Sequence, residues 1–286
     1  MMKIAILGTG IMGSGMASRL LEQGMPVTVW NRNASRAAPL ADAGAVIAPT
    51  PADAAAQADL VIAMVADDDA SRQVWLGENG AFAAMRPGTI AVECSTLTHG
   101  WIGKLFDEAA AHGISLLDAP VTGSRVQAAS GTLRFLVGGE AASVAKAQSV
   151  FDVLGSETIY LGPSGSGAML KLINNFLCGV QVAALAEAMV AIERSGLDVE
   201  AAFRLIGTGA PGSPLVNAVG DRMIQRVYTP QFLIPLMAKD LGYAERTMKE
   251  MGIESRMAAP AISHFHTAAR QGHQEDDIAA VVEHLR

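Results

Sequence analysis

The chain has 286 residues, of which half are hydrophobic, and it carries a formal net charge of −7 at pH 7. This length suits two domains of ordinary size, and the hydrophobic content is enough to fill their cores. The acidic balance argues against nucleic acid or an anionic membrane as the main partner, because both are bound by basic surfaces. We therefore expect small molecules as partners.

The first motif is a predicted strand, a glycine turn and a helix. An apolar run at 3–7 leads into Gly8, Gly10 and Gly13, and a helix-forming segment follows at 14–23. Gly8 allows the tight turn, Gly10 lets a pyrophosphate approach the backbone, and Gly13 lets the helix pack on the strand. Free amides at the helix start hold the anion. The predicted cofactor contacts in this loop are Gly8, Gly10, Ile11, Met12 and Gly13.

The next predicted strand, 27–30, decides between the two nicotinamide cofactors. In NAD-binding domains a carboxylate after this strand binds the adenosine ribose, but here Asn31 and Arg32 follow it. A guanidinium suits a ribose 2′-phosphate, which a carboxylate would repel. The sequence therefore predicts NADP(H) over NAD(H), with Asn31 and Arg32 as the reading residues. The alternative for Arg32 is a solvated surface arginine.

Strands and helices alternate as far as residue 162. The other predicted strands are 60–65, 89–93, 115–118, 135–137 and 158–161, with Ala-rich helices between many of them. This alternation predicts an α/β Rossmann domain, a doubly wound and mostly parallel sheet, over residues 1–162. Its glycine loop then lies at the carboxyl end of the first strand, where such sheets bind ligands.

The second half reads as all-α, with a domain boundary at 163. A long apolar helix is predicted at 168–195, followed by helices at 199–206, 236–251 and 258–270, and no convincing strand. The long helix is apolar almost all round, so we expect it to be buried, to join the two domains and to pack between subunits. The all-helical substrate and oligomerisation domain is thus predicted over residues 163–286.

No other segment points to a metal, a membrane or secretion. Cys94 and Cys178 lack metal or redox spacing, so each is expected to be a free, buried thiol, and no metal site is predicted. The apolar start of the chain is too short for a signal peptide or a membrane span. We therefore expect a cytoplasmic protein.

Polar residues on the long helix are candidates for catalysis. Lys171, Asn174 and Asn175 are three and four residues apart, so they share a helix face and can point into one cleft. Desolvation lowers the pKa of a lysine ammonium, which suits a general acid that protonates a carbonyl oxygen as hydride arrives. A lysine whose ammonium reaches water is the alternative. The segment 118–124 offers amides and hydroxyls for a substrate carboxylate, or is an ordinary turn.

In combination these motifs resemble the β-hydroxyacid dehydrogenase family. The resemblance adds 165–167 (Gly-Ser-Gly) and 239–241 (Lys-Asp-Leu) to the motifs above, and it covers essentially the whole chain. The family includes 3-hydroxyisobutyrate dehydrogenase, tartronate semialdehyde reductase and glyoxylate/succinic semialdehyde reductases. Its members are commonly dimers or tetramers, so the resemblance implies a homodimer or homotetramer.

The resemblance also implies roles for single residues. Lys171 matches the catalytic lysine, and Asn175 matches the asparagine that helps fix the substrate. Thr122, Gly123 and Ser124 match the substrate-carboxylate loop, which commonly reads Ser-Gly-Gly in the family. The extra methyl of Thr122 and the bulk of Ser124 are departures that bear on substrate choice.

Four more residues are implied to lie at the cofactor. Thr96 matches a residue near the nicotinamide ribose and the substrate, and Lys239 matches a lysine that closes over the cofactor. Val65 and Ala66 match a cofactor-lining loop that often reads Leu-Pro. The Gly-Ser form of the carboxylate loop, followed by Arg125, is more similar to the glyoxylate and succinic semialdehyde reductase branch. Arg125 either pairs with a distal anion of the substrate or is solvated.

The resulting hypothesis is an NADP(H)-dependent oxidoreductase that interconverts a small aldehyde or keto acid with its hydroxy acid, with Lys171 as general acid or base. Two alternatives stay open at this point. Imine reductases share the architecture but generally lack lysine at this position. A non-catalytic cofactor-binding module would fit a lost lysine or a degraded carboxylate loop, and neither is seen.

Overall fold

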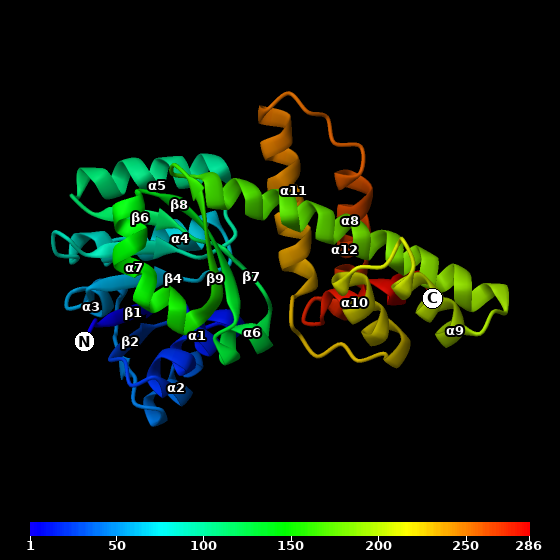
Figure 1. Ribbon diagram of the computed structural model, residues 1–286, viewed down its shortest axis with the longest axis horizontal. Helices are drawn as coiled ribbons and strands as arrows, with labels where there is room; N and C mark the ends of the chain where they lie inside the picture. Colours follow the sequence, from blue (N-terminus) through cyan, green and yellow to red (C-terminus); the bar gives the residue numbers. More distant parts are fainter. The chain divides into compact units, whose positions relative to one another are not determined.

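The computed structural model describes all 286 residues and divides into two compact units, Met1–Lys171 and Leu172–Arg286. The first unit is a nine-stranded sheet with helices, and the second is helical (Figure 1). Helix α8 (Ser166–Ser195) runs from the first unit into the second. The predicted fold class, a Rossmann domain followed by an all-α domain with a long helix joining them, is therefore confirmed.

The sheet is parallel over most of its width. Its strands are β1 (Ile4–Leu7), β2 (Val27–Trp30), β3 (Val46–Ile47), β4 (Leu60–Ala63), β5 (Ile90–Glu93), β6 (Ser115–Asp118), β7 (Val121–Thr122), β8 (Leu133–Gly139) and β9 (Gly155–Gly162). The order is β3-β2-β1-β4-β5-β6-β8-β7, and β9 pairs with β8. The order reverses direction between β1 and β4, so the loops after these strands diverge and open a crevice at the carboxyl edge.

Helices cover both faces of this sheet. They are α1 (Ile11–Glu22), α2 (Ala38–Asp42), α3 (Pro51–Ala55), α4 (Asp68–Leu76), α5 (His99–Ala111), α6 (Arg125–Ser130) and α7 (Ala141–Leu154). Side chains alternate along β1, so Ile4 and Ile6 enter one core cluster while Ala5 and Leu7 enter another. The first cluster packs against α1 and α7, and the second against α3, α4 and α5.

The structure corrects several element boundaries. The strand expected at 60–65 ends at Ala63, because Val65 donates its N–H to the Ser95 hydroxyl (2.8 Å) and no longer to a neighbouring strand. Strands β3 and β7 were not expected, since two residues give no readable alternation. Strand β8 is antiparallel to β6 and β7, which departs from the parallel pattern.

Backbone N–H groups at the start of helix α8 donate hydrogen bonds to a buried carboxylate. Asp118, at the end of β6, is fully buried and accepts from the N–H groups of Gly165 and Ala168, both at 2.8 Å. These bonds satisfy backbone donors that a helix start leaves without intrahelical partners. Burial raises the pKa of Asp118 to about 6, although the N–H groups of Ala168 and Gly165 oppose this.

The expectation that helix α8 is buried on all sides is wrong, because one row of apolar side chains in its first half is exposed; we call this row the exposed stripe. Leu170, Ile173 and Leu177 are 36%, 42% and 54% exposed, whereas Met189 and Val190 farther along are buried. Cys178 lies beside this stripe and is only half-buried, so the prediction of a buried thiol holds for Cys94 alone. The helix is long and apolar enough to cross a membrane, yet half of its most apolar window is buried in the protein, as in a core helix. The homo-oligomer stays a prediction.

The second unit is built around the rest of α8. Its other elements are α9 (Val199–Thr208), α10 (Pro214–Gln225), α11 (Ile234–Glu250), α12 (Ala258–Ala268), a π-helical turn (Ala269–His273) and a 3-10 helix (Ile278–Leu285). Helices α9, α11 and α12 lie within a few residues of the predicted positions. Helix α10 and the final 3-10 helix were not expected. Strands are absent, as predicted, apart from a single bridge between Leu233 and Asp277.

The raised pKa of Asp118 predicts a pH-dependent stability. The folded protein holds this proton more tightly than the unfolded chain, so the contribution of Asp118 to the unfolding free energy is greatest below about pH 4 and falls as pH rises to about 6. The unfolding free energy of the wild type, relative to that of Asp118→Asn, should therefore fall by about 3 kcal/mol between pH 3 and pH 7. Urea denaturation of both proteins at several pH values measures this, and a pH-independent difference would contradict it.

Candidate active site

The glycine loop has the close packing that the sequence predicted. Gly8 has φ +103°, a conformation that side chains disfavour, and an added Cβ would lie 2.3 Å from the Met64 carbonyl oxygen. A Cβ at Gly13 would lie 1.9 Å from the carbonyl oxygen of Gly8. No side chain fits at either position, so these two glycines bring α1 against β1.

Gly10 is different, because an added Cβ would meet no protein atom within 4 Å. Its backbone is in an ordinary extended conformation, and α1 begins after it without a side-chain cap. The hydroxyl of Thr9 is buried and has no hydrogen-bond partner. The open space at Gly10 and the uncapped amides at Ile11 and Met12 fit the pyrophosphate of a dinucleotide, whereas the buried Thr9 hydroxyl is out of reach of a ligand.

The predicted cofactor-reading residues have different environments. The Asn31 side chain accepts from the Thr9 N–H (2.9 Å) and donates to the Asn33 carbonyl (2.9 Å), so it fixes the shape of the glycine loop. Arg32 is exposed and is available to an anion. Arg36 is also exposed and lies in the 3-10 turn Ala34–Arg36. This second arginine, four residues after Arg32, was not among the predicted cofactor contacts.

The predicted nicotinamide residues follow β4 and β5, which pair side by side with Ala63 opposite Glu93. Val65 is half-buried, Ala66 is exposed and Thr96 is half-buried. The structure therefore brings the two segments together and leaves parts of both accessible.

The predicted carboxylate loop lies between β7 and α6. Gly123 has φ +121°, and a Cβ there would lie 2.9 Å from the Gln127 side chain. The N–H and hydroxyl of Ser124 both donate to the Gln127 side-chain oxygen, at 2.9 and 2.7 Å. The Ser124 donors are thus engaged within the protein in this structure, and Asp118 at the start of the segment caps α8 and does not serve a substrate.

Lys171, on helix α8, contacts the strand that leads into this loop. Its ammonium donates to the carbonyl oxygen of Val121 at 2.7 Å, one residue before Thr122. Lys171 is partly buried and its ammonium donates to a protein carbonyl, so the alternative of a lysine whose ammonium only reaches water does not fully describe it. A proton donor therefore lies beside the segment predicted to hold a substrate carboxylate.

Asn175 is one turn farther along α8 and is held by a residue that the sequence reading did not single out. Its side-chain amide, 3% exposed, donates to the carboxylate of Asp240 at 2.6 Å and accepts from Asn174 at 3.0 Å. The other carboxylate oxygen of Asp240 lies 2.9 Å from the Lys239 ammonium, which also lies 4.7 Å from the Tyr243 ring centroid. Asp240 stands in the Lys-Asp-Leu motif, so its position was visible but its function was not.

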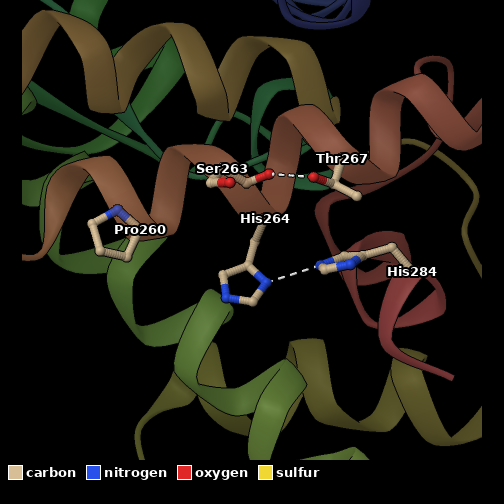
Figure 2. A pocket seen from close by; sticks show the side chains of 5 residues that line it. All are labelled: Pro260, Ser263, His264, Thr267 and His284. Carbon is tan, nitrogen blue, oxygen red and sulfur yellow. Dashed lines mark hydrogen bonds between the residues drawn. The ribbon is translucent and has the colours of Figure 1, made fainter.

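One pocket in the second unit has a volume of about 280 Å³. Figure 2 shows its lining: Pro260, Ser263, His264, Thr267 and His284. The imidazoles of His264 and His284 share a hydrogen bond of 2.8 Å, and His264 also contacts the carboxylate of Glu187 at 3.0 Å. Burial, with a smaller effect from His264, lowers the pKa of His284. The pocket contains no predicted site residue.

Comparison with known proteins places the chain in a family. Residues 3–162 match the NAD binding domain of 6-phosphogluconate dehydrogenase, and residues 165–285 match the NAD-binding domain of NADP-dependent 3-hydroxyisobutyrate dehydrogenase. The chain belongs to the β-hydroxyacid dehydrogenase family, as the motifs indicated. It is a nicotinamide-dependent oxidoreductase of the type that acts on CH–OH groups.

Individual relatives cover the whole chain. The chain is 34% identical to the chloroplastic glyoxylate/succinic semialdehyde reductase 2 of Arabidopsis thaliana, over 99% of this chain and 79% of the relative. It is 33% identical to the NAD-dependent L-serine dehydrogenase of Pseudomonas aeruginosa, over 98% and 97%. A solved structure of Mycobacterium tuberculosis 3-hydroxyisobutyrate dehydrogenase with L-serine superposes with a TM-score of 0.90 at 30% identity, over 100% and 99%.

The glycine loop allows a matched pair of substitutions. Gly10→Ala should leave the melting temperature nearly unchanged, because the methyl enters open space, but should raise the Kd of the dinucleotide about 10-fold by excluding its phosphates. Gly13→Ala should destabilise the fold itself, since the methyl overlaps the Gly8 carbonyl.

Thermal denaturation and calorimetric titration with NADPH and NADH separate the two effects. If Gly10→Ala bound both cofactors as tightly as wild type, the predicted pyrophosphate position would be wrong.

Proposed function

We propose that this protein is an NADP(H)-dependent reductase that interconverts a small aldehyde or keto acid with its hydroxy acid. The observation that carries the proposal is the 2.7 Å hydrogen bond from Lys171 to Val121, which holds an ammonium beside the Thr122–Ser124 loop. The glyoxylate, succinic semialdehyde and 3-hydroxyisobutyrate enzymes among its relatives act on carboxylate-bearing molecules of this kind.

In the proposed reaction each side chain has one task. NADPH, when bound, supplies the hydride for the carbonyl carbon. Lys171 gives its proton to the carbonyl oxygen, so that a C–H and an O–H bond form as the C=O π bond breaks. Thr122, Gly123 and Ser124 are assigned to the substrate carboxylate, for which Ser124 exchanges a bond to the Gln127 side chain for one to the substrate. Asn175, fixed by Asp240, positions the substrate beside the lysine. In the oxidative direction Lys171 is the base.

The proposed cofactor assignment places the glycine loop at the pyrophosphate and Arg32 at the 2′-phosphate. Val65, Ala66, Thr96 and Lys239 are assigned to the nicotinamide half. The relatives differ in cofactor, since one is named NAD-dependent, so the choice must rest on residues of this chain. The exposed guanidinium of Arg32 and the absence of a carboxylate after β2 support NADP(H).

Substitution of Lys171 tests the reaction. Lys171→Ala should lower kcat about 10²- to 10⁴-fold, because a general acid contributes that much, while the Kd of NADPH stays near the wild-type value. The assay follows NADPH consumption with glyoxylate, succinic semialdehyde, tartronate semialdehyde, methylmalonate semialdehyde and cyclic imines. Normal turnover of the variant would remove Lys171 from the mechanism, and turnover of imines alone would favour an imine reductase.

Substitution of Arg32 tests the cofactor. Arg32→Ala should raise the Kd of NADPH about 10- to 100-fold, since a charge-assisted hydrogen bond to phosphate is lost, and should leave that of NADH nearly unchanged. Arg204→Ala, which changes an exposed arginine on α9 that has no proposed role, is the matched control and should affect neither Kd. A wild-type preference for NADH would overturn the assignment.

A further inference from the structure

A buried carboxylate at the end of β5 organises the segments around it. Glu93 is fully buried and accepts from the Ser71 hydroxyl (2.6 Å), the Trp75 indole (2.9 Å) and the Ser95 N–H (2.9 Å). Burial raises the pKa of Glu93, and these donors oppose the rise. Ser71 in turn accepts from the Trp101 indole at 3.0 Å, so Glu93 connects α4, α5 and the turn after β5.

One of these bonds continues into the turn after β4. Ser95, whose N–H is held by Glu93, accepts the N–H of Val65 on its hydroxyl at 2.8 Å. Ser95 is only 2% exposed, so a ligand does not reach it, but its neighbour Thr96 and its partner Val65 are half-buried. We call this connection the Glu93–Ser95–Val65 chain.

A second connection joins the same two turns three residues farther along each of them. The N–H and hydroxyl of Thr98 donate to the two carboxylate oxygens of Asp68, at 2.9 and 2.6 Å. Segments 65–68 and 95–98 are therefore held together near both ends. The residues assigned to the cofactor, Val65, Ala66 and Thr96, all lie within these segments.

We propose that Ser95 is a positioning residue for the nicotinamide half of the cofactor, because it transmits the fixed position of Glu93 to the turn after β4. The inference rests on the proposed assignment of Val65, Ala66 and Thr96 to that half. Strand order supports it: the glycine loop and Arg32 follow β1 and β2, whereas Val65 and Ser95 follow β4 and β5 on the other side of the sheet's reversal point. A dinucleotide that crosses this edge places its two halves on opposite sides.

Two serines that share Glu93 provide the test. Ser95→Ala removes the acceptor for Val65 and a hydroxyl bond to Glu93. Ser71→Ala also removes a hydroxyl bond to Glu93 but leaves the Ser95–Val65 bond in place, so the two variants differ at the Val65 bond. Calorimetry measures the Kd of NADPH and of its adenosine fragment 2′,5′-ADP for wild type and both variants, with NADH and ADP in parallel. Thermal melting gives the stability of each.

Ser95→Ala should raise the Kd of the whole dinucleotide about 5- to 10-fold, as expected for one lost hydrogen bond, and leave that of the adenosine fragment unchanged. Ser71→Ala should leave the ratio of the two Kd values within about twofold of wild type, even if it lowers the melting temperature. A merely structural Ser95 predicts instead that the ratios of both variants match wild type.

That last result, or a loss of fragment binding equal to the loss of dinucleotide binding, would overturn the inference. A different outcome would refute the proposed reaction alone. Wild-type protein that binds cofactor with the expected ratios, yet turns over no carbonyl acid, would refute the reaction and support the positioning role.

Discussion

The structure depends on one place where the chain has no room for a side chain. Helix α1 approaches β1 so closely that a Cβ at Gly13 would overlap the carbonyl oxygen of Gly8, and Gly8 itself lies against the Met64 carbonyl. This approach fixes the first helix, the first strand and the turn after β4 relative to one another. Gly10, between these two glycines, faces open space, because an added Cβ there would meet no protein atom within 4 Å. A dinucleotide loop is therefore a consequence of backbone packing and of missing side chains.

Buried polar groups then position the other turns at the same edge of the sheet. Asn31 holds the glycine loop, Glu93 holds the turns after β4 and β5 through Ser95, and Asp118 holds the start of α8. Each of these side chains makes at least two hydrogen bonds, and such bonds are what allow a polar side chain to be buried. Arg32 and Ala66, which lie on these turns, are exposed.

The long helix connects this edge to the proposed chemistry. Asp118 starts α8, and Lys171 follows within its first two turns with its ammonium on the Val121 carbonyl. Asn175 is one turn later and is held by Asp240 from α11. Lysine and asparagine on one helix therefore have a fixed spacing, although separate parts of the chain hold their side chains.

The sequence by itself determined the fold class, the family, and the glycine, lysine and asparagine motifs, because these depend on local order along the chain. A strand precedes Gly8, a helix follows Gly10, and four residues separate Lys171 from Asn175. Only the tertiary structure decided that Asp118 caps a helix, that Ser124 bonds to Gln127, and that Glu93 and Asp240 hold their neighbours. Those contacts join residues whose proximity comes from strand order and helix packing. The exposed stripe at Leu170 and Leu177 has the same origin, since composition records how apolar a helix is but not which of its faces the fold covers.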